Sequence, residues 1–561
     1  MSPDWQQLAK AKRDSIAALI PKEWILENVP TPTEQRDVTG TYVHQYLSQK
    51  EIEITETDAV GIVAKTTAGA WTAVDVARAF CHRAAIAHQL VNCLHEIAFD
   101  DALATAAALD AHYAQHKAPV GPLHGLPVSL KDQFHVRGLE TTMGYVGWIG
   151  TFEGRRDTGK EKVFESEMVK ELRELGAVLY CKTSVPHTLM HGETENNIVG
   201  YTMNPRNRLL SCGGSSGGEG ALIAMRGSVL GFGTDIGGSI RIPAAFNGVY
   251  GIRPSSGRLP YEGMANSMDG QNTILSVVGP LAASVPSLTL AVKALLSKQP
   301  WLGDPLVHEI PWRSDQEQQV LDIVGSGKPG KLSFGVLRHD GLAAVTPPVK
   351  RAIEITVQTL QKLGHEVIEW QPPSHKRISD TALETWLFDG GDDCMSAFEL
   401  SGEQPRPNIT PLYKKRGPKY TASDIARVNV AKRQLQKEYL DYWNSTVSQT
   451  GTGRPVDAII APAAPWPAVR PGMYYHIGYT TCFNLLDYTS AVLPVTKVDK
   501  SIDKVDAGFK ALSDVDQKCQ DAYDPEIYDG SPVALQLVGR RLQEEKVLAL
   551  AAYVDGALKT Q

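Results

Sequence analysis

Two glycine-flanked serines are the residues of this sequence best suited to chemistry. Ser215 lies in GGSSGGEG and Ser239 lies in DIGGSIRIP, both within the stretch from Ser211 to Pro254. Glycine on both sides of a serine frees the backbone and leaves the hydroxyl uncrowded. Consecutive small residues also let main-chain N–H groups converge on one point, as an oxyanion requires. The stretch therefore predicts acyl chemistry.

A run rich in glycine and serine is more often a flexible linker, and this alternative has to be weighed first. Here the run is followed directly by EGALIAM, which favours a helix, and then by the apolar residues 229–232. Because a linker does not usually lie between two packed elements, we expect a buried functional loop. Residues 213–217 also match G-x-S-x-G, the nucleophile elbow of α/β-hydrolases, which requires a strand before it. Residues 206–210 supply only a poor strand, so the elbow is a weak match.

Lys131 is a candidate base for a serine nucleophile. Serine needs a base within hydrogen-bond reach at neutral pH, and none of the 15 histidines stands in a triad-like sequence context. A lysine can serve if burial or positive surroundings keep it neutral. Lys131 follows Pro127-Val-Ser-Leu, and strand alternation puts it on the same face as Ser129. By itself, this pattern is also typical of a solvated lysine that closes a strand.

The elements that must position these residues alternate between helix and strand. A helix over 161–175, a stop at Gly176 and a strand over 177–181 form one unit, and the same order recurs at 349–363, Gly364 and 366–370. Further strands are predicted at 126–130, 332–337, 458–461, 491–495 and 533–538, and further helices at 1–19, from Thr72, at 100–114, 421–443 and 543–558. This alternation predicts an α/β fold whose sheet is covered on both faces. No repeat, low-complexity tract or clean linker divides the chain, so we predict one large domain.

Composition and charge exclude several classes of partner. The 561 residues are 42% hydrophobic and 21% charged, which suits a large core. The net charge of −7, without a polybasic segment, argues against nucleic acid or a membrane surface as partner. Seven scattered cysteines without metal-ligand spacing indicate reduced thiols, a cytoplasmic location and no metal. The first residues show no signal-peptide pattern.

Residues 271–292 carry no charge and are long enough to span a bilayer. Pro280, Pro286 and several polar residues interrupt the stretch. We therefore predict a buried turn followed by a helix from Pro286, and no membrane span.

The motifs around the two serines resemble those of the amidase signature family. The segments that carry the resemblance are GGSSGGEGALIA, GFGTDIGGSIRIPAAFNGVYGIRPSSGRLP and, upstream, GLPVSLKD. It extends over most of the chain, from LRELGAVLYCKTSVPHTLMHGETENNIVGYTMNP to SPVALQLVGRRLQEEKVLALAA. Within the family the chain looks closest to fungal general amidases or acetamidases, and more distantly to fatty-acid amide hydrolases.

The resemblance implies a mixed central β-sheet sandwiched by α-helices in one amidase domain, residues 1–561. Within it we expect a signature core at about 120–300, an N-terminal helical segment at about 1–70 and a variable substrate-channel region at about 372–453.

Catalytic roles also follow from the resemblance. Ser239 would be the nucleophile, Ser215 the bridging serine and Lys131 the terminal base, and the peptide Gly214–Ser215 would be cis. Neutral Lys131 would take a proton from Ser215 while Ser215 takes one from Ser239.

Other positions are carried over in the same way. The backbone N–H groups of Ile236, Gly237, Gly238 and Ser239 would form the oxyanion hole. Ser215 and Leu189, with Met190 and His191, match substrate-binding positions. Asp235 and Arg241 would support the nucleophile loop, with a surface ion pair as the alternative interpretation, and Ser216 would support the relay.

These inferences predict a cofactor-free hydrolase that cleaves carboxylic amides to acid and amine through an acyl-enzyme, with esters as side substrates. The expected partner is a small-molecule amide, without nucleic acid or a membrane span, and a homodimer is left open. One alternative is an α/β-hydrolase-type esterase that acylates Ser215 with the help of a histidine. Another is a non-catalytic scaffold or an amidotransferase-type subunit that requires a partner.

Overall fold

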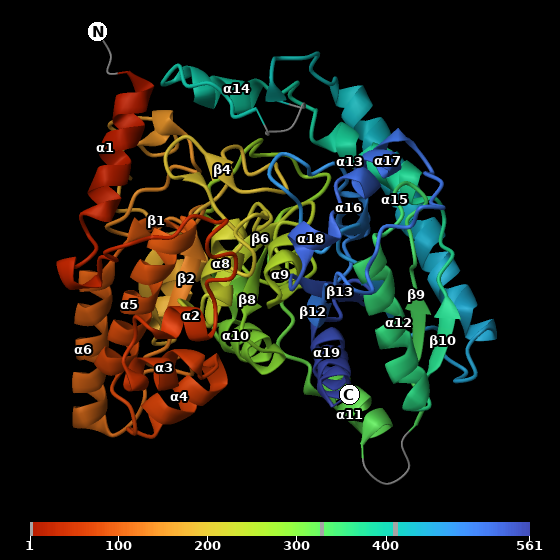
Figure 1. The fold of residues 1–561 in the computed structure, drawn as a ribbon, viewed down its shortest axis with the longest axis horizontal. Helices are drawn as coiled ribbons and strands as arrows, with labels where there is room; N and C mark the ends of the chain where they lie inside the picture. The colour runs from red at the N-terminus through yellow and green to blue at the C-terminus, as the bar shows by residue number, and fades with distance from the viewer. Residues whose placement is uncertain (1–3, 326–329, 408–412, 561) are drawn as a thin grey trace.

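A mixed eleven-stranded β-sheet runs through the molecule (Figure 1). The computed structural model describes residues 4–325, 330–407 and 413–560. Across the sheet the strands are β1 (Leu94–Ile97), β3 (Val178–Thr183), β2 (Pro127–Lys131), β6 (Leu230–Asp235), β8 (Val277–Ala282), β7 (Tyr250–Arg253), β12 (Ser490–Lys497), β13 (Pro532–Val538), β11 (Ala458–Pro462), β9 (Ser333–Val336) and β10 (Glu366–Glu369). A separate hairpin pairs β4 (Glu195–Asn196) with β5 (Gly200–Tyr201).

The sheet contains both parallel and antiparallel pairs. Strand β2 pairs in parallel with β3 and β6, and β9 pairs in parallel with β10 and β11. The middle of the sheet, from β6 through β8, β7, β12 and β13 to β11, is antiparallel. Every residue of β2, β3, β6 and β8 is buried. Because successive strand residues point to opposite faces, the sheet is covered on both faces there, which confirms the predicted α/β fold.

Helices surround the sheet (Figure 1). They are α1 (Trp5–Ala17), α2 (Thr41–His44), α3 (Gln49–Glu56), α4 (Ala59–Thr67), α5 (Ala73–Val91), α6 (Phe99–His116), α7 (Glu167–Glu174), α8 (Gly217–Ala224), α9 (Arg241–Asn247), α10 (Val285–Ser297), α11 (Ser314–Val324), α12 (Pro347–Lys362), α13 (His375–Thr385), α14 (Asp392–Glu399), α15 (Ala422–Ser445), α16 (Gly478–Leu486), α17 (Asp514–Asp521), α18 (Pro525–Tyr528) and α19 (Glu544–Lys559). Short 3₁₀ turns cover Lys22–Trp24, Val146–Trp148, Pro300–Leu302 and Thr446–Ser448.

Local signals placed several helix ends correctly. Helix α5 begins after Thr72, whose side chain accepts a hydrogen bond from the Asp75 N–H. Gly176 follows α7 with φ of 87°, a conformation that glycine adopts without strain. Helix α7 is shorter than the predicted 161–175, because Ser166 precedes it in an extended conformation and its hydroxyl donates to the Gly263 carbonyl.

The prediction for residues 271–292 was partly wrong. The segment before Pro286 forms β8, a strand between β6 and β7, rather than a turn. It lacks charge because it is buried in the middle of the sheet, and α10 follows it as expected. Among the residues that the structure describes, no helix has the length and apolar character needed to cross a membrane.

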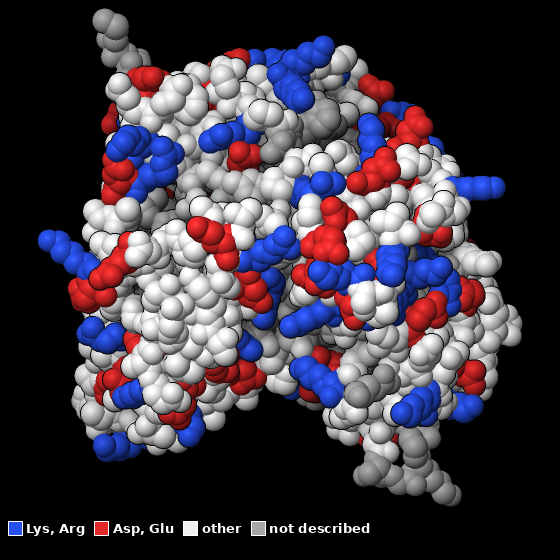
Figure 2. Space-filling view, viewed as in Figure 1, with Lys and Arg blue, Asp and Glu red and all other residues white. Residues whose placement is uncertain are grey.

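The surface carries charges of both signs. Figure 2 shows lysine and arginine interspersed with aspartate and glutamate on one face of the molecule. The predicted variable region folds largely as α13, α14 and α15, which lie along the upper and right sides in Figure 1.

Candidate active site

Three segments that lie far apart in the sequence meet beside β2 and β6. Lys131 is the last residue of β2, Ser215 comes shortly before α8, and Ser239 lies in the turn between β6 and α9. Strands β2 and β6 are parallel neighbours, with Leu130 opposite Phe232. Because parallel neighbours end at the same edge of a sheet, Lys131 and the turn after β6 lie close together.

Lys131 is buried and contacts two hydroxyl groups. Its Nζ donates hydrogen bonds to Ser215 Oγ and to Thr234 Oγ1, both at 2.7 Å. Burial lowers the pKa of Lys131 to about 7, although the nearby carboxylates of Asp235 and Glu219 oppose this shift. The solvated lysine considered from the sequence is therefore wrong, and a large fraction of this side chain is neutral near pH 7.

Ser215 and Ser239 differ in their access to solvent. Ser215 is 1% exposed, whereas Ser239 is 9% exposed and lines a cavity. The peptide Gly214–Ser215 is cis, as the resemblance implied. The backbone N–H of Ser216 donates to the Ser239 carbonyl at 3.1 Å, which ties the two serine segments together. Within the described part of the chain no hydrogen bond joins the Ser215 and Ser239 hydroxyls.

The turn after β6 presents backbone N–H groups beside Ser239. The N–H of Gly238 donates to Asp235 Oδ1 at 2.8 Å and is already used. In the described ranges, the N–H groups of Ile236, Gly237 and Ser239 have no acceptor. On the other side of the turn, Thr480 Oγ1 donates to the Gly237 carbonyl at 2.6 Å. Three of the four N–H groups predicted for the oxyanion hole are thus unoccupied.

Asp235 and Arg241 form a buried pair beneath this turn. Arg241 Nε donates to Asp235 Oδ2 and Arg241 Nη2 donates to Oδ1, both at 3.0 Å, and neither side chain is exposed. Burial by itself would raise the pKa of Asp235. The charge and the hydrogen bonds of Arg241 outweigh this effect and lower the pKa to about 2. The alternative of a surface ion pair is therefore wrong. Such planar bidentate contacts fix both position and orientation.

Helix α16 completes the support of the turn. Asn484 Nδ2 donates to Asp235 Oδ1 at 2.7 Å, and Arg241 Nη2 donates to Asn484 Oδ1 at 2.6 Å. Arg241 Nη1 also donates to the Thr480 carbonyl at 3.0 Å. The loop that carries Ser239 is therefore held by residues from β6, α9 and α16.

A cavity of about 470 Å³ opens at Ser239. Its wall is largely apolar, with Leu189, Ile236, Trp386 and Ile477 among the lining residues. Cavities of this size and character suit small organic ligands.

Three further predicted positions belong to the same region. Met190 and His191 line the cavity, and burial lowers the pKa of His191 to about 4, so its ring is neutral at pH 7. Ser216 does not reach the relay: Thr234 donates its N–H to Ser216 Oγ at 3.3 Å, and Ser216 Oγ faces the Thr234 carbonyl at 3.4 Å. Ser216 thus joins α8 to β6.

Comparisons with known proteins identify the family of this chain. The model of the amidase family matches residues 75–548. The chain belongs to the amidase signature family. An acetamidase of Emericella nidulans is 47% identical over 100% of this chain and 99% of its own length, and an acetamidase of Aspergillus oryzae is 47% identical over 99% of both. A solved fatty acid amide hydrolase superposes with a TM-score of 0.89 at 33% identity, covering 99% of this chain and 95% of that one. The chain is an amide-hydrolysing enzyme.

Sequence reasoning missed several residues of this amidase site. Thr234 stands one residue before Asp235 in the signature segment, and Gln133 stands two residues after Lys131. Proximity in the sequence was a usable signal for both. Asn484 and Trp386 had no such signal, because they reach the turn after β6 only when α13 and α16 pack together beside it.

Glu219 is a further buried group of the amidase fold. Its carboxylate accepts hydrogen bonds from Ser129 Oγ at 2.6 Å and Thr183 Oγ1 at 2.8 Å. Burial raises its pKa to about 7. Among the described residues, no group of three or more His, Cys, Asp or Glu side chains could hold a metal ion.

His476 also lines the cavity, and its ring contacts a buried carboxylate. His476 Nε2 lies 2.5 Å from Asp340 Oδ2. Together with His191, it is one of the two cavity-lining histidines of the described residues that a serine–histidine mechanism could use.

The nucleophile-elbow alternative does not fit this family or this structure. Residues 206–210 form turns rather than a strand, and Ser215 is buried against Lys131. Ser215 therefore lacks the exposed position at the end of a strand that an elbow requires.

Proposed function

We propose that this amidase hydrolyses its substrates through a Ser-Ser-Lys relay in which Ser239 is the nucleophile, Ser215 the bridging serine and Lys131 the base. The observation that carries the proposal is the 2.7 Å contact between Lys131 Nζ and Ser215 Oγ in a site where burial lowers the lysine pKa to about 7. A general base is most effective when its pKa lies near the working pH. Ser239 supplies the hydroxyl that faces the cavity.

In the first half-reaction, Ser239 Oγ attacks the amide carbonyl carbon. Its proton passes to Ser215 Oγ as the Ser215 proton passes to Lys131 Nζ. The negative charge on the carbonyl oxygen is stabilised by the N–H groups of Ile236, Gly237 and Ser239. Collapse of this tetrahedral intermediate breaks the C–N bond, and the proton returns from Lys131 through Ser215 to the leaving nitrogen. The amine departs and the acyl group stays on Ser239.

In the second half-reaction, water attacks the acyl carbon and gives its proton to the same relay. Collapse returns the proton to Ser239 Oγ and releases the carboxylic acid. Because an alcohol leaves more easily than an amine, the same site should also cleave esters. The chemistry uses no cofactor in this scheme.

For the substrate, we propose small aliphatic amides. The names of the two acetamidases that are 47% identical support acetamide itself. The cavity of about 470 Å³ with its apolar wall also supports longer aliphatic or aryl acyl groups. A cytoplasmic location is supported by the seven cysteines, all buried as free thiols. One amidase domain over the whole chain, and a homodimer as its assembly, remain predictions.

The test is amine release by the purified chain from a series of amides that runs from acetamide to aryl and longer aliphatic acyl groups. We expect turnover of the short amides by the wild type and none by Ser239→Ala. Activity of the isolated chain would also exclude a subunit that depends on a partner. A fully active Ser239→Ala variant would contradict the proposal.

A further inference from the structure

Lys131 makes a second contact, with Thr234, which the relay does not use. Its Nζ lies 2.7 Å from Thr234 Oγ1, and Thr234 Oγ1 in turn donates to Gln133 Oε1 at 2.7 Å. All three side chains are buried, with Gln133 1% and Thr234 3% exposed. A buried hydroxyl between a lysine and an amide can donate its single proton to only one of them.

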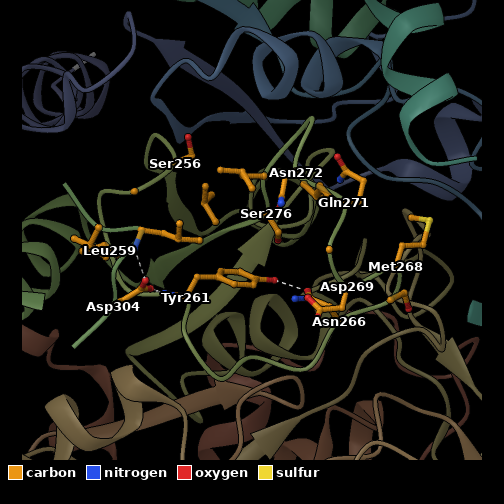
Figure 3. Close-up of a pocket in the computed structure, with 18 residues that line it drawn as sticks. Ser256, Leu259, Tyr261, Asn266, Met268, Asp269, Gln271, Asn272, Ser276 and Asp304 are labelled. Atoms are coloured by element: carbon orange, nitrogen blue, oxygen red, sulfur yellow. Dashed lines mark hydrogen bonds between the residues drawn. The ribbon is translucent and has the colours of Figure 1, made fainter. Parts of the chain in front are cut away.

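The Gln133 amide presents its nitrogen to its far side and its oxygen to Thr234. Gln133 Nε2 donates to Asn266 Oδ1 and to the Tyr261 hydroxyl, each at 2.9 Å. Tyr261 also donates to Asn266 Oδ1 at 2.7 Å. Figure 3 shows this contact in a second pocket, which both residues line and which is separate from the cavity at Ser239. A carbonyl oxygen can only accept, so the Gln133 atom that faces Asn266 is the nitrogen. The Gln133 atom that faces Thr234 is therefore the oxygen.

This orientation fixes the direction of the next hydrogen bond. Because Gln133 Oε1 can only accept, it takes the one proton of the Thr234 hydroxyl. Toward Lys131, Thr234 can then only accept. One N–H of the lysine is held by Thr234, and the hydroxyl cannot turn to donate to the lysine nitrogen.

Neutral lysine has one lone pair, which must face Ser215 to receive its proton. If Thr234 were free to donate, it would compete for this lone pair, since a buried amine nitrogen is a strong acceptor. We propose that Gln133 is a positioning residue that acts through Thr234 to keep the lone pair of neutral Lys131 directed at Ser215. This inference rests on the proposed relay and adds to it the group that orients the base.

Other groups around the lysine set its charge state rather than its orientation. The carboxylates of Asp235, from β6, and Glu219, from α8, both favour the protonated form. Asp235 is bound to Arg241, and Glu219 accepts from Ser129 and Thr183, so neither takes the Thr234 proton.

The experiment compares Gln133→Leu with Gln133→Glu. Leucine removes the acceptor and frees the Thr234 proton. We expect kcat to fall about tenfold to a hundredfold, part of the ~10²–10⁴ that general base action supplies, with KM nearly unchanged. The pH midpoint of kcat should move to lower pH, because a proton donated to the lone pair stabilises neutral lysine. Glutamate keeps an acceptor but adds negative charge, so its midpoint should move to higher pH.

A second pair of variants tests the intermediate hydroxyl. Thr234→Val has no proton to donate, but it removes the acceptor that holds one N–H of Lys131. It should lower kcat because the lone pair is no longer oriented, and lower the pH midpoint because the protonated lysine loses an acceptor. Thr234→Ser should keep both near the wild-type values. Thr356→Val is the matched control, because Thr356 is also buried and donates to the Ala352 carbonyl at 2.9 Å in α12. It should change the melting temperature alone.

Two results would overturn the inference. One is a Gln133→Leu variant that loses melting temperature but keeps kcat and the pH midpoint. The other is a midpoint shift in the same direction for Gln133→Leu and Gln133→Glu. If Gln133→Leu does not fold, a folded Thr234→Val variant that keeps kcat and the pH midpoint would overturn the inference instead. The relay itself is tested separately by Lys131→Met: if that variant keeps the wild-type midpoint, the proposed function fails and not only this inference.

Discussion

Lys131 Nζ lies 2.7 Å from Ser215 Oγ, although 84 positions separate the two residues in the chain. The contact exists because β2 and β6 are parallel neighbours and because α8, which begins just after Ser215 and leads to β6, packs against β2. It is made in a fully buried place, where the charged form of the lysine is disfavoured. The fold therefore gives Lys131 a pKa of about 7, and the proposed relay needs no histidine as its base.

The nucleophile should be identifiable by covalent labelling. A fluorophosphonate should attach to Ser239, because its hydroxyl lines the cavity while Ser215 is 1% exposed. Ser239→Ala should lose both the label and turnover. Ser228→Ala serves as the control, since Ser228 is buried and donates to the Leu230 carbonyl at 2.9 Å, away from the cavity, and this variant should still be labelled at Ser239. Mass spectrometry locates the adduct; an adduct on Ser215 would contradict the assignment.

Ser215→Ala should separate the relay from a direct contact between Lys131 and Ser239. The substitution keeps a small side chain but removes the hydroxyl that Lys131 contacts. Acylation should slow by about 10²–10⁴, the usual contribution of general base action. Residual acylation should remain, because the nucleophile and the oxyanion donors are intact. Single-turnover acylation and the melting temperature are the measurements. Near-normal acylation in a folded variant would mean that Ser215 transfers no proton.

The pH dependence of kcat should report the charge of Lys131. The relay needs the neutral lysine, and its pKa is about 7, so the rate should rise with pH through this region and level off above it. Lys131→Met should lose this midpoint and show a small rate that keeps rising with hydroxide. As a check, His476→Gln, which removes the partner of Asp340, should retain the midpoint whatever its rate. A midpoint lost in His476→Gln and kept in Lys131→Met would refute a lysine base.

The burial of Lys131 should also lower the free energy of unfolding. The lysine pKa is 10.5 in a solvated chain and about 7 in the fold, so between these values the unfolded chain binds more protons. The contribution of Lys131 to stability then rises as pH increases through this window and is lowest below it.

Lys131→Met should therefore raise the melting temperature, more at pH 7 than at pH 10. Lys182→Met is the contrasting variant, because Lys182 is equally buried but pairs with Asp132 at 3.0 Å, and breaking that pair should lower the melting temperature. An unchanged melting temperature of Lys131→Met across this range would show that the lysine is not held neutral.

The turn after β6 should tolerate a side chain at Gly237 but not at Gly238. A Cβ on Gly238 would lie 2.3 Å from Thr480 Oγ1, and the φ of 137° there is one that other residues rarely adopt. A Cβ on Gly237 would lie 3.2 Å from the Trp386 ring, which needs only a small adjustment. Gly238→Ala should thus lose activity and melting temperature, and Gly237→Ala should be clearly milder in both. Equal effects in the two variants would show that the turn is not fixed by these contacts.

Much of the secondary structure could be predicted from local sequence. Thr72 caps α5 and Gly176 ends the turn after α7 because each acts on neighbouring backbone groups. The central strand β8 could not be predicted in this way, since a short apolar run becomes a strand only when β6 and β7 pair with it.

For the site, the sequence by itself determined the family and the candidate residues: the motifs around Ser215, Ser239 and Lys131 point to an amidase. Only the tertiary structure decided what those residues can do. Burial lowers the lysine pKa, and it depends on every segment packed around the end of β2. The Asp235–Arg241 pair also depends on the tertiary structure, because it is fully buried and Asn484 of α16 donates a hydrogen bond to Asp235. These properties depend on dielectric and on contacts between distant segments, which no local pattern of residues encodes.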